Sequence, residues 1–151
     1  MNMCVLIPST EPKPPSRRIH VVAAVIYSDD RSHQILISRR PDHLHQGGLW
    51  EFPGGKVEPD ELPEQALSRE LKEELDIQVT QAQPYLQVSH DYSDKQVLLD
   101  IWQVNGFSGL PRGMEGQDCR WVELSELLGS GSDYAFPAAN QAILDKLATE
   151  L

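Results

Sequence analysis

The pattern of apolar and polar residues predicts a chain of strands with one prominent helix near its middle. Residues 19–27 (IHVVAAVIY) form a nearly continuous apolar run, which is typical of a buried strand. Residues 34–40 (QILISRR) alternate, as expected for a second strand. Because only a short polar turn separates these two segments, we expect them to pair as a hairpin.

The remainder of the pattern predicts further strands and a closing helix. Strands are expected at 49–52, 78–90, 96–104 and 119–124, with Pro84 at a bend or at a sheet edge. Residues 106–116 are expected to form a loop, and Ser125 is expected to cap a short turn. The last helix should run from about residue 137 to residue 150, with Ile143, Leu144 and Leu147 as its buried face.

The central helix, over about residues 61–75, carries two different faces. Its apolar face is an i, i+4, i+8 stripe that should enter the core, formed by Leu67, Leu71 and Leu75. Next to this stripe, positions three and four apart place Glu70, Glu73 and Glu74 side by side.

Clustered carboxylates of this kind permit two interpretations. Like charges at these spacings weaken a helix by about 0.2–0.5 kcal/mol per pair, and such a segment is often only a solvated helix face. The cluster becomes favourable when Mg²⁺ or a similar hard cation lies between the oxygens, and Ala66 is expected to leave room for one. The Gly54-Gly55 loop and Glu61, which precede the helix, favour the metal site.

The same residues carry a resemblance to a known family. Gly55, then Glu61 after five residues, then Arg69-Glu70-Leu71 and Glu73-Glu74 after seven more resemble the Nudix box, G-x5-E-x7-R-E-U-x-E-E-x-G-U. The one departure is Asp76, where the family has glycine. Glycine there would suit a left-handed helix end, and aspartate tolerates that conformation better than most residues.

The resemblance spans about residues 19–148 and implies a fold. That fold is the Nudix fold, of the α/β (α+β) class: an α/β/α sandwich with a mixed central β-sheet. The proline-rich residues 1–18 are expected to be a flexible tail, and residues 19–151 to form a single Nudix hydrolase domain.

The resemblance also implies an activity. It implies Mg²⁺-dependent hydrolysis of a nucleoside triphosphate to the monophosphate and pyrophosphate, with Mn²⁺ as a possible substitute. The expected substrate is 8-oxo-dGTP, so that the enzyme would cleanse the nucleotide pool and avoid mutation. By resemblance, the metal ligands are the Gly54 carbonyl, Glu70, Glu73, Glu74 and Glu115.

Other residues of the Nudix box receive supporting roles in the same way. Arg69 lies four residues before Glu73 and is expected to orient that carboxylate. Glu61 and Lys56 are expected to position the loop. The spacing does not decide which carboxylate acts as general base, and Glu70 and Glu115 are both candidates.

Residues outside the box are expected to bind the substrate. Arg40 takes the place of a phosphate-binding arginine in MutT-type members of the family, or alternatively is solvated. Phe52, in the MutT-like segment GLWEFPGGK, is expected near the nucleobase or else in the core, whereas Trp50 is expected in the core. Lys56 flanks the glycine loop, and Asp94 occupies a base-contacting place or only a hairpin turn.

Asn140 carries the predicted base specificity. In the segment FPAAN, its amide offers one acceptor and two donors, which matches the protonated N7 and the O6 of 8-oxoguanine. Normal guanine has acceptors at both positions, so one contact would be lost. The alternative is that Asn140 only caps the helix.

Composition limits the partners. The chain has 151 residues and a formal charge of −10, and lacks the basic stripe of a protein that binds a nucleic-acid polymer. Two unrelated cysteines and no membrane-length apolar run favour a cytoplasmic protein, and we expect a monomer acting on a small nucleotide. The alternatives are a Nudix hydrolase of another nucleoside diphosphate derivative and a non-catalytic Nudix-fold binding module.

Overall fold

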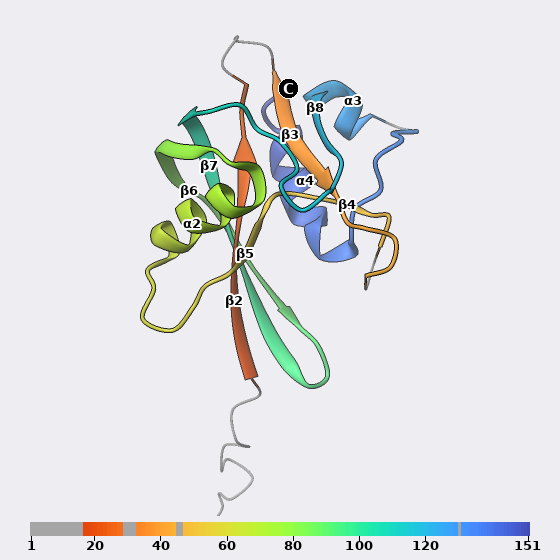
Figure 1. Cartoon of the computed structure of the whole chain (residues 1–151). Coiled ribbons are helices and arrows are strands. Elements are labelled where there is room, and N and C mark those ends of the chain that lie inside the picture. Colours follow the sequence, from red (N-terminus) through yellow and green to blue (C-terminus); the bar gives the residue numbers. More distant parts are fainter. Residues whose placement is uncertain (1–16, 29–32, 45–46, 130) are drawn as a thin grey trace, which may run out of the picture.

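A four-stranded mixed sheet forms the centre of the molecule (Figure 1). The computed structural model describes residues 17–28, 33–44, 47–129 and 131–151. The sheet has the order β5-β2-β7-β6. Its strands are β5 (Gly54–Lys56), β2 (Arg17–Ile26), β7 (Lys95–Ser108) and β6 (Gln78–Asp91). Because β2 runs parallel to β7 while the other pairs are antiparallel, the predicted mixed sheet is confirmed.

A second sheet of three strands lies beside the first. It has the order β4-β3-β8, formed by β4 (Trp50–Glu51), β3 (Gln34–Arg39) and β8 (Cys119–Glu123). The predicted hairpin of the first two strands is therefore wrong, because β2 and β3 share only the isolated bridge Tyr27–Ile35. Both edges of β2 are occupied by β5 and β7, so β3 has to pair elsewhere.

Helices cover both faces of the central sheet (Figure 1). On one face, α2 (Pro63–Leu75) packs against the β2 residues Val22, Ala24 and Ile26. On the other face, α3 (Leu124–Leu128) and α4 (Gln141–Ala148) pack with Ala23 and Val25. Both sides of β2 are thus buried, which explains its continuous apolar sequence and confirms the expected α/β/α arrangement.

The predicted apolar stripe of the central helix is fully buried. Leu67, Leu71 and Leu75 are each at most 1% exposed. Burying a leucine side chain contributes about 1.5–3 kcal/mol, so this stripe anchors α2 to the sheet. Ala66 belongs to the same apolar cluster and is fully buried, so the expectation that it leaves room for an ion is wrong.

Several element boundaries differ from those that the sequence predicted. β2 begins at Arg17, and the rest of the predicted tail lies outside the described residues. β7 continues to Ser108, through the start of the predicted loop. Ser125 lies inside α3 and does not cap it. The final segment begins with a 3₁₀ turn, η1 (Ala138–Asn140), before α4, and Leu144 is only partly buried.

β6 lies at the edge of the central sheet and has a register shift between Pro84 and Leu86, as predicted for that proline.

Within the described part of the chain, no helix combines the length and the apolar character needed to cross a membrane.

The ends of α2 are set by local chemistry. Pro63 occupies the first turn, where its missing N–H costs nothing, and the Gln65 side chain accepts a hydrogen bond from the Leu62 N–H at 2.9 Å. At the other end, Asp76 adopts the left-handed conformation (φ 58°, ψ 38°). Its carboxylate accepts hydrogen bonds from Lys72 and Arg112, each at 3.0 Å.

A pair of substitutions at Asp76 separates backbone strain from the ion pairs. Asp76→Gly and Asp76→Ala both remove the carboxylate, but only alanine must keep a side chain in the left-handed region. We expect Asp76→Gly to exceed Asp76→Ala in free energy of unfolding by about 1 kcal/mol. Urea unfolding of both variants measures this difference, and equal stabilities would show that the helix end carries no such strain.

Candidate metal and nucleotide site

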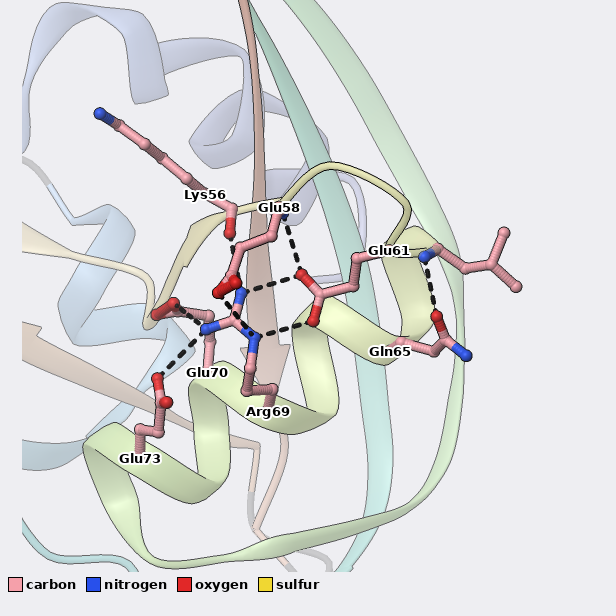
Figure 2. Close-up of polar contacts among 8 residues, drawn as sticks. Lys56, Glu58, Glu61, Gln65, Arg69, Glu70 and Glu73 are labelled. Atoms are coloured by element: carbon pink, nitrogen blue, oxygen red, sulfur yellow. Dashed lines mark hydrogen bonds and ion pairs between the residues drawn. The ribbon is translucent and has the colours of Figure 1, made fainter.

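Arg69 is the centre of a network of ion pairs at the loop that feeds α2 (Figure 2). Its Nε and Nη2 atoms donate to the two oxygens of Glu61 at 2.8 and 2.9 Å. Its Nη1 atom donates to Glu70 at 2.9 Å and to Glu73 at 3.2 Å, which confirms the expected contact with Glu73. The Lys56 carbonyl accepts a further bond from Nη2 at 3.0 Å. One guanidinium therefore holds helix and loop together.

The same contacts fix Glu61 in its ionised form. Hydrogen bonds from Arg69 and from the Glu58 N–H lower the pKa of Glu61 to about 2. Figure 2 shows the Lys56 side chain directed away from this network, with its ammonium group at a distance from the carboxylates. Lys56 thus contributes its backbone to the network and leaves its charge available elsewhere.

The glycine loop is packed too closely for side chains. A Cβ on Gly55 would lie 2.2 Å from a carboxylate oxygen of Glu70. A Cβ on Gly54 would lie 2.0 Å from the Val22 carbonyl oxygen in the neighbouring strand. Glycine at these positions lets β5 pair with β2 and lets Glu70 lie directly on the loop backbone.

Glu74 is the buried acid of the helix. It is 9% exposed, whereas the side chain of its neighbour Glu73 is 58% exposed. Burial, a hydrogen bond with Glu70 and the charges of Glu70, Glu115 and Glu51 raise the pKa of Glu74 well above its ordinary value. Without a cation, this carboxyl group therefore favours its protonated form.

Glu115 approaches Glu74 from a loop that lies on the end of α2. The Met114 N–H donates to the Glu74 carbonyl at 2.9 Å, and the Arg112 N–H donates to the Leu75 carbonyl at 3.1 Å. These bonds satisfy carbonyls that the helix leaves unpaired at its C-terminal end. Glu115 itself is exposed, at the rim of the acidic group.

The carboxylates fit a divalent cation in chemistry, although they do not converge as a preformed cage. Over the described residues, no three His, Cys, Asp or Glu side chains come together closely enough to hold a metal ion. The burial and the like charges that raise the pKa of Glu74 are, however, the situation that a hard cation with oxygen ligands relieves. Glu70 and Glu73 both bind Arg69, whereas Glu74 and Glu115 line a common cavity.

A cavity of about 560 Å³ lies on the face of the central sheet opposite to α2. Its floor is apolar and includes Val21, Ala23 and Ile101. All the predicted substrate-binding residues are among its lining residues, namely Arg40, Phe52, Lys56, Asp94 and Asn140. The structure therefore brings together residues that are up to 100 positions apart in the sequence.

The side chains that line this cavity come from different surroundings. Phe52 is 5% exposed and stacks on Phe136 with ring centroids 5.1 Å apart. It is thus both a core residue and a lining residue, whereas Trp50 packs in the core as expected. Asn140 ends the 3₁₀ turn and makes no capping hydrogen bond through its side chain to α4. Asp94 lies in the exposed turn between β6 and β7.

A smaller cavity of about 240 Å³ adjoins the larger one. Glu74 and Glu115 line the smaller cavity, and Arg40 and Glu51 line both. Arg40 Nη1 lies 3.5 Å from Glu51 Oε1 at this junction. The two cavities therefore meet at Arg40 and Glu51, with Asn140 in the larger cavity and Glu74 and Glu115 in the smaller one.

Two residues of these cavities were missed by the sequence reasoning. Glu51 received no role from the sequence, yet burial raises its pKa and it lines the smaller cavity with Glu115. Its place next to Pro53-Gly54-Gly55 was the available signal. Gln117, which lines the smaller cavity, had no sequence signal, because an isolated glutamine in a loop is uninformative.

His43 also lines the smaller cavity, as an exposed loop residue.

Comparison with known proteins gives consistent matches along most of the chain. A model of the NUDIX domain matches residues 21–146. The 8-oxo-dGTP diphosphatase of Escherichia coli (strain K12) is 34% identical over 131 residues, covering 87% of this chain and 97% of that protein. The CTP pyrophosphohydrolase of the same organism is 42% identical over 112 residues, covering 74% and 81%.

Solved structures agree with the sequence matches. A structure from work on MutT of Aliivibrio salmonicida and Vibrio cholerae superimposes with a TM-score of 0.76 at 41% identity, covering 89% of this chain and 100% of that one.

Substitutions of two basic residues on α2, Arg69→Lys and Lys72→Arg, test the role of the ion-pair network around Arg69. Lysine has no planar fork, so Arg69→Lys cannot bind Glu61 bidentately while also holding Glu70. We expect this variant to lose at least about ten-fold in kcat/KM for nucleoside triphosphate hydrolysis with little change in Tm. The matched control is Lys72→Arg, which pairs with Asp76 away from the network and should retain activity. Equal activities of the two variants would contradict the assigned role.

Proposed function

The chain belongs to the Nudix hydrolase family, and from this premise we propose that it converts 8-oxo-dGTP and water into 8-oxo-dGMP and pyrophosphate. The relatives identify it at a coarser level as a MutT-like Nudix pyrophosphohydrolase. The finer proposal is that it acts on the oxidised nucleotide in the free pool, which would keep 8-oxoguanine from entering DNA.

The observation that carries this proposal is the pair of residues that the two cavities share. Asn140 and Phe52 line the larger cavity, and Arg40 and Glu51 line both it and the smaller, acidic one. A nucleoside triphosphate has the same order of parts: a flat base, a sugar and a polyanionic tail. We therefore assign the base to the apolar cavity and the phosphates to the junction, near Arg40 and Lys56.

The Asn140 amide supports the preference for 8-oxoguanine. Since its side chain does not cap α4, its carbonyl oxygen and amino group are available to a base in the cavity. The carbonyl would accept from the protonated N7 of 8-oxoguanine while the amino group donates to O6. With guanine, the Asn140 carbonyl would face the N7 lone pair. The loss of this one hydrogen bond is the basis on which the site would prefer 8-oxoguanine to guanine.

Mg²⁺ fits the acidic group as its cation. We assign Glu70, Glu74, Glu115 and the Gly54 carbonyl as its first candidates, and Glu73 as a further one from the predicted set. When bound, the cation supplies Lewis acidity toward the phosphates and favours ionisation of a coordinated water. Mn²⁺, which also takes oxygen ligands, is the expected substitute.

The chain's own residues then have distinct tasks in the reaction. Arg40 and Lys56 attract and orient the phosphate oxygens, and Arg69 holds Glu70 against the glycine loop. A carboxylate takes the proton of the attacking water as the bond between the α- and β-phosphates breaks, and the pyrophosphate leaves with that electron pair. Glu70 and Glu115 are the candidates for this base.

Cytidine triphosphate is the second candidate substrate. It is favoured by one specific observation, the 42% identity to a protein named CTP pyrophosphohydrolase. The amide of Asn140 could also serve the donor and acceptor edge of cytosine, so the cavity itself permits either base.

Rates of pyrophosphate release with Mg²⁺ at substrate concentrations well below KM distinguish these assignments. We expect kcat/KM for 8-oxo-dGTP to exceed that for dGTP by at least about five-fold, since one lost hydrogen bond with an unpaired partner costs about 1–3 kcal/mol. CTP should be slower than 8-oxo-dGTP. A faster reaction with CTP would move the protein to the cytidine-specific branch, and equal rates for 8-oxo-dGTP and dGTP would remove the proposed specificity.

Asn140→Ala shows whether this amide is the source of the preference. The variant should lose most of the difference between 8-oxo-dGTP and dGTP while it keeps a measurable rate with both. Gln141→Ala, which changes an exposed amide at the next position, is the matched control and should keep the preference. An unchanged ratio in Asn140→Ala would assign base recognition to another residue of the cavity.

A further inference from the structure

The side chain of Gln117 spans the two segments that carry Glu74 and Glu115. Its Oε1 atom accepts a hydrogen bond from the Glu115 N–H at 2.9 Å. Its Nε2 atom donates to the Glu74 carbonyl at 3.1 Å. One amide group therefore links the backbone of the loop acid directly to the backbone of the helix acid.

The surroundings of Gln117 restrict it to this position. Gln117 is half-buried and lines the smaller cavity together with both acids. A Cβ on Gly113 would lie 2.0 Å from the Gln117 carbonyl oxygen and 3.1 Å from its Oε1 atom. The loop thus closes tightly around this side chain, and its glycine at 113 permits that approach.

The loop has three further connections to the end of α2, but none of them is made by Glu115 itself. Arg112 Nη2 binds the Asp76 carboxylate at 3.0 Å, the Arg112 N–H binds the Leu75 carbonyl at 3.1 Å, and the Met114 N–H binds the Glu74 carbonyl at 2.9 Å. All three lie before Glu115 in the chain. After it, Gly116 has a positive φ of 81° and its N–H binds the Gly113 carbonyl within the loop at 3.2 Å. The Gln117 amide therefore joins the Glu115 N–H to α2 from the far side of Glu115.

We propose that Gln117 is a positioning residue that sets Glu115 opposite Glu74, so that both carboxylates can bind one divalent cation. This proposal rests on the proposed function, in which these two acids belong to the metal site. The amide is suited to this task, because it offers an acceptor to the loop and a donor to the helix at the same time. Residues that orient metal ligands in this way commonly change metal affinity about 10–100-fold when they are replaced.

Gln117→Met tests the proposal, since methionine has a similar length but cannot make either hydrogen bond. Mn²⁺ binding to the nucleotide-free protein, followed by electron paramagnetic resonance, is the first measurement. We expect the dissociation constant for Mn²⁺ to rise about ten-fold. The Mg²⁺ concentration for half-maximal hydrolysis should rise to a similar extent, with kcat at saturating Mg²⁺ changed less. Gln83→Met is the matched control, because it removes a glutamine amide that bonds Gln103 on the exposed sheet edge.

A double-mutant cycle separates positioning from a general loss of structure. Glu115→Gln should also weaken Mn²⁺ binding, and Gln117→Met should add little to it, because Gln117 acts through Glu115. Strictly additive effects, or an unchanged Mn²⁺ affinity in Gln117→Met with Glu115→Gln impaired, would overturn the proposal and leave the proposed function intact. Unchanged Mn²⁺ affinity in Glu115→Gln itself would instead remove Glu115 from the metal site.

Discussion

The repulsion among carboxylates at the end of α2 is the constraint on which the rest of this structure depends. Glu70 and Glu74 lie one turn apart, and the charges of Glu115 and Glu51 add to theirs. Such a group destabilises a folded protein unless a cation compensates it or a proton remains bound. Arg69 compensates Glu61, Glu70 and Glu73, whereas burial and the neighbouring carboxylates raise the pKa of Glu74 on the inner side. This difference between the two sides identifies the place where a metal ion would have its largest effect.

The fold makes this arrangement possible by fixing every segment that contributes to it. The apolar stripe of α2 is buried against β2, so the acids on its adjoining face cannot turn away from one another. Gly54 and Gly55 bring the preceding strand into contact with both β2 and Glu70. The left-handed Asp76 ends the helix and leaves its last carbonyls free to bind the loop of Glu115. The opposite face of the same sheet forms the apolar cavity, which meets the smaller, acidic cavity at Arg40 and Glu51.

The sequence predicted the parts of the site whose spacing follows from a regular element. The stripe of Leu67, Leu71 and Leu75 and the contact between Arg69 and Glu73 follow from helix geometry, and the structure confirms them. The left-handed conformation of Asp76, expected from the glycine that the Nudix box has there, is also confirmed. The sequence did not predict the second sheet, because alternation along a strand carries no information about its partner. The pairing of β2 with β7, whose partner residues are 78 positions apart, was therefore missed, and β2 was instead expected to form a hairpin with β3. Gln117 and Glu51 were missed for a related reason, since their importance comes from neighbours distant in the sequence.

Anomalous diffraction from Mn²⁺ in crystals of the protein is the measurement that tests the central claim most directly. The account predicts a Mn²⁺ ion coordinated by the carboxylates of Glu70 and Glu74, with Glu115 turned toward the same ion and Arg69 still bound to Glu61. It also predicts that the ion lies beside the smaller cavity, within reach of a phosphate held by Arg40. An ion found only on the exposed side, at Glu58 or Glu73, would contradict the account, because the buried repulsion at Glu74 would then serve no metal.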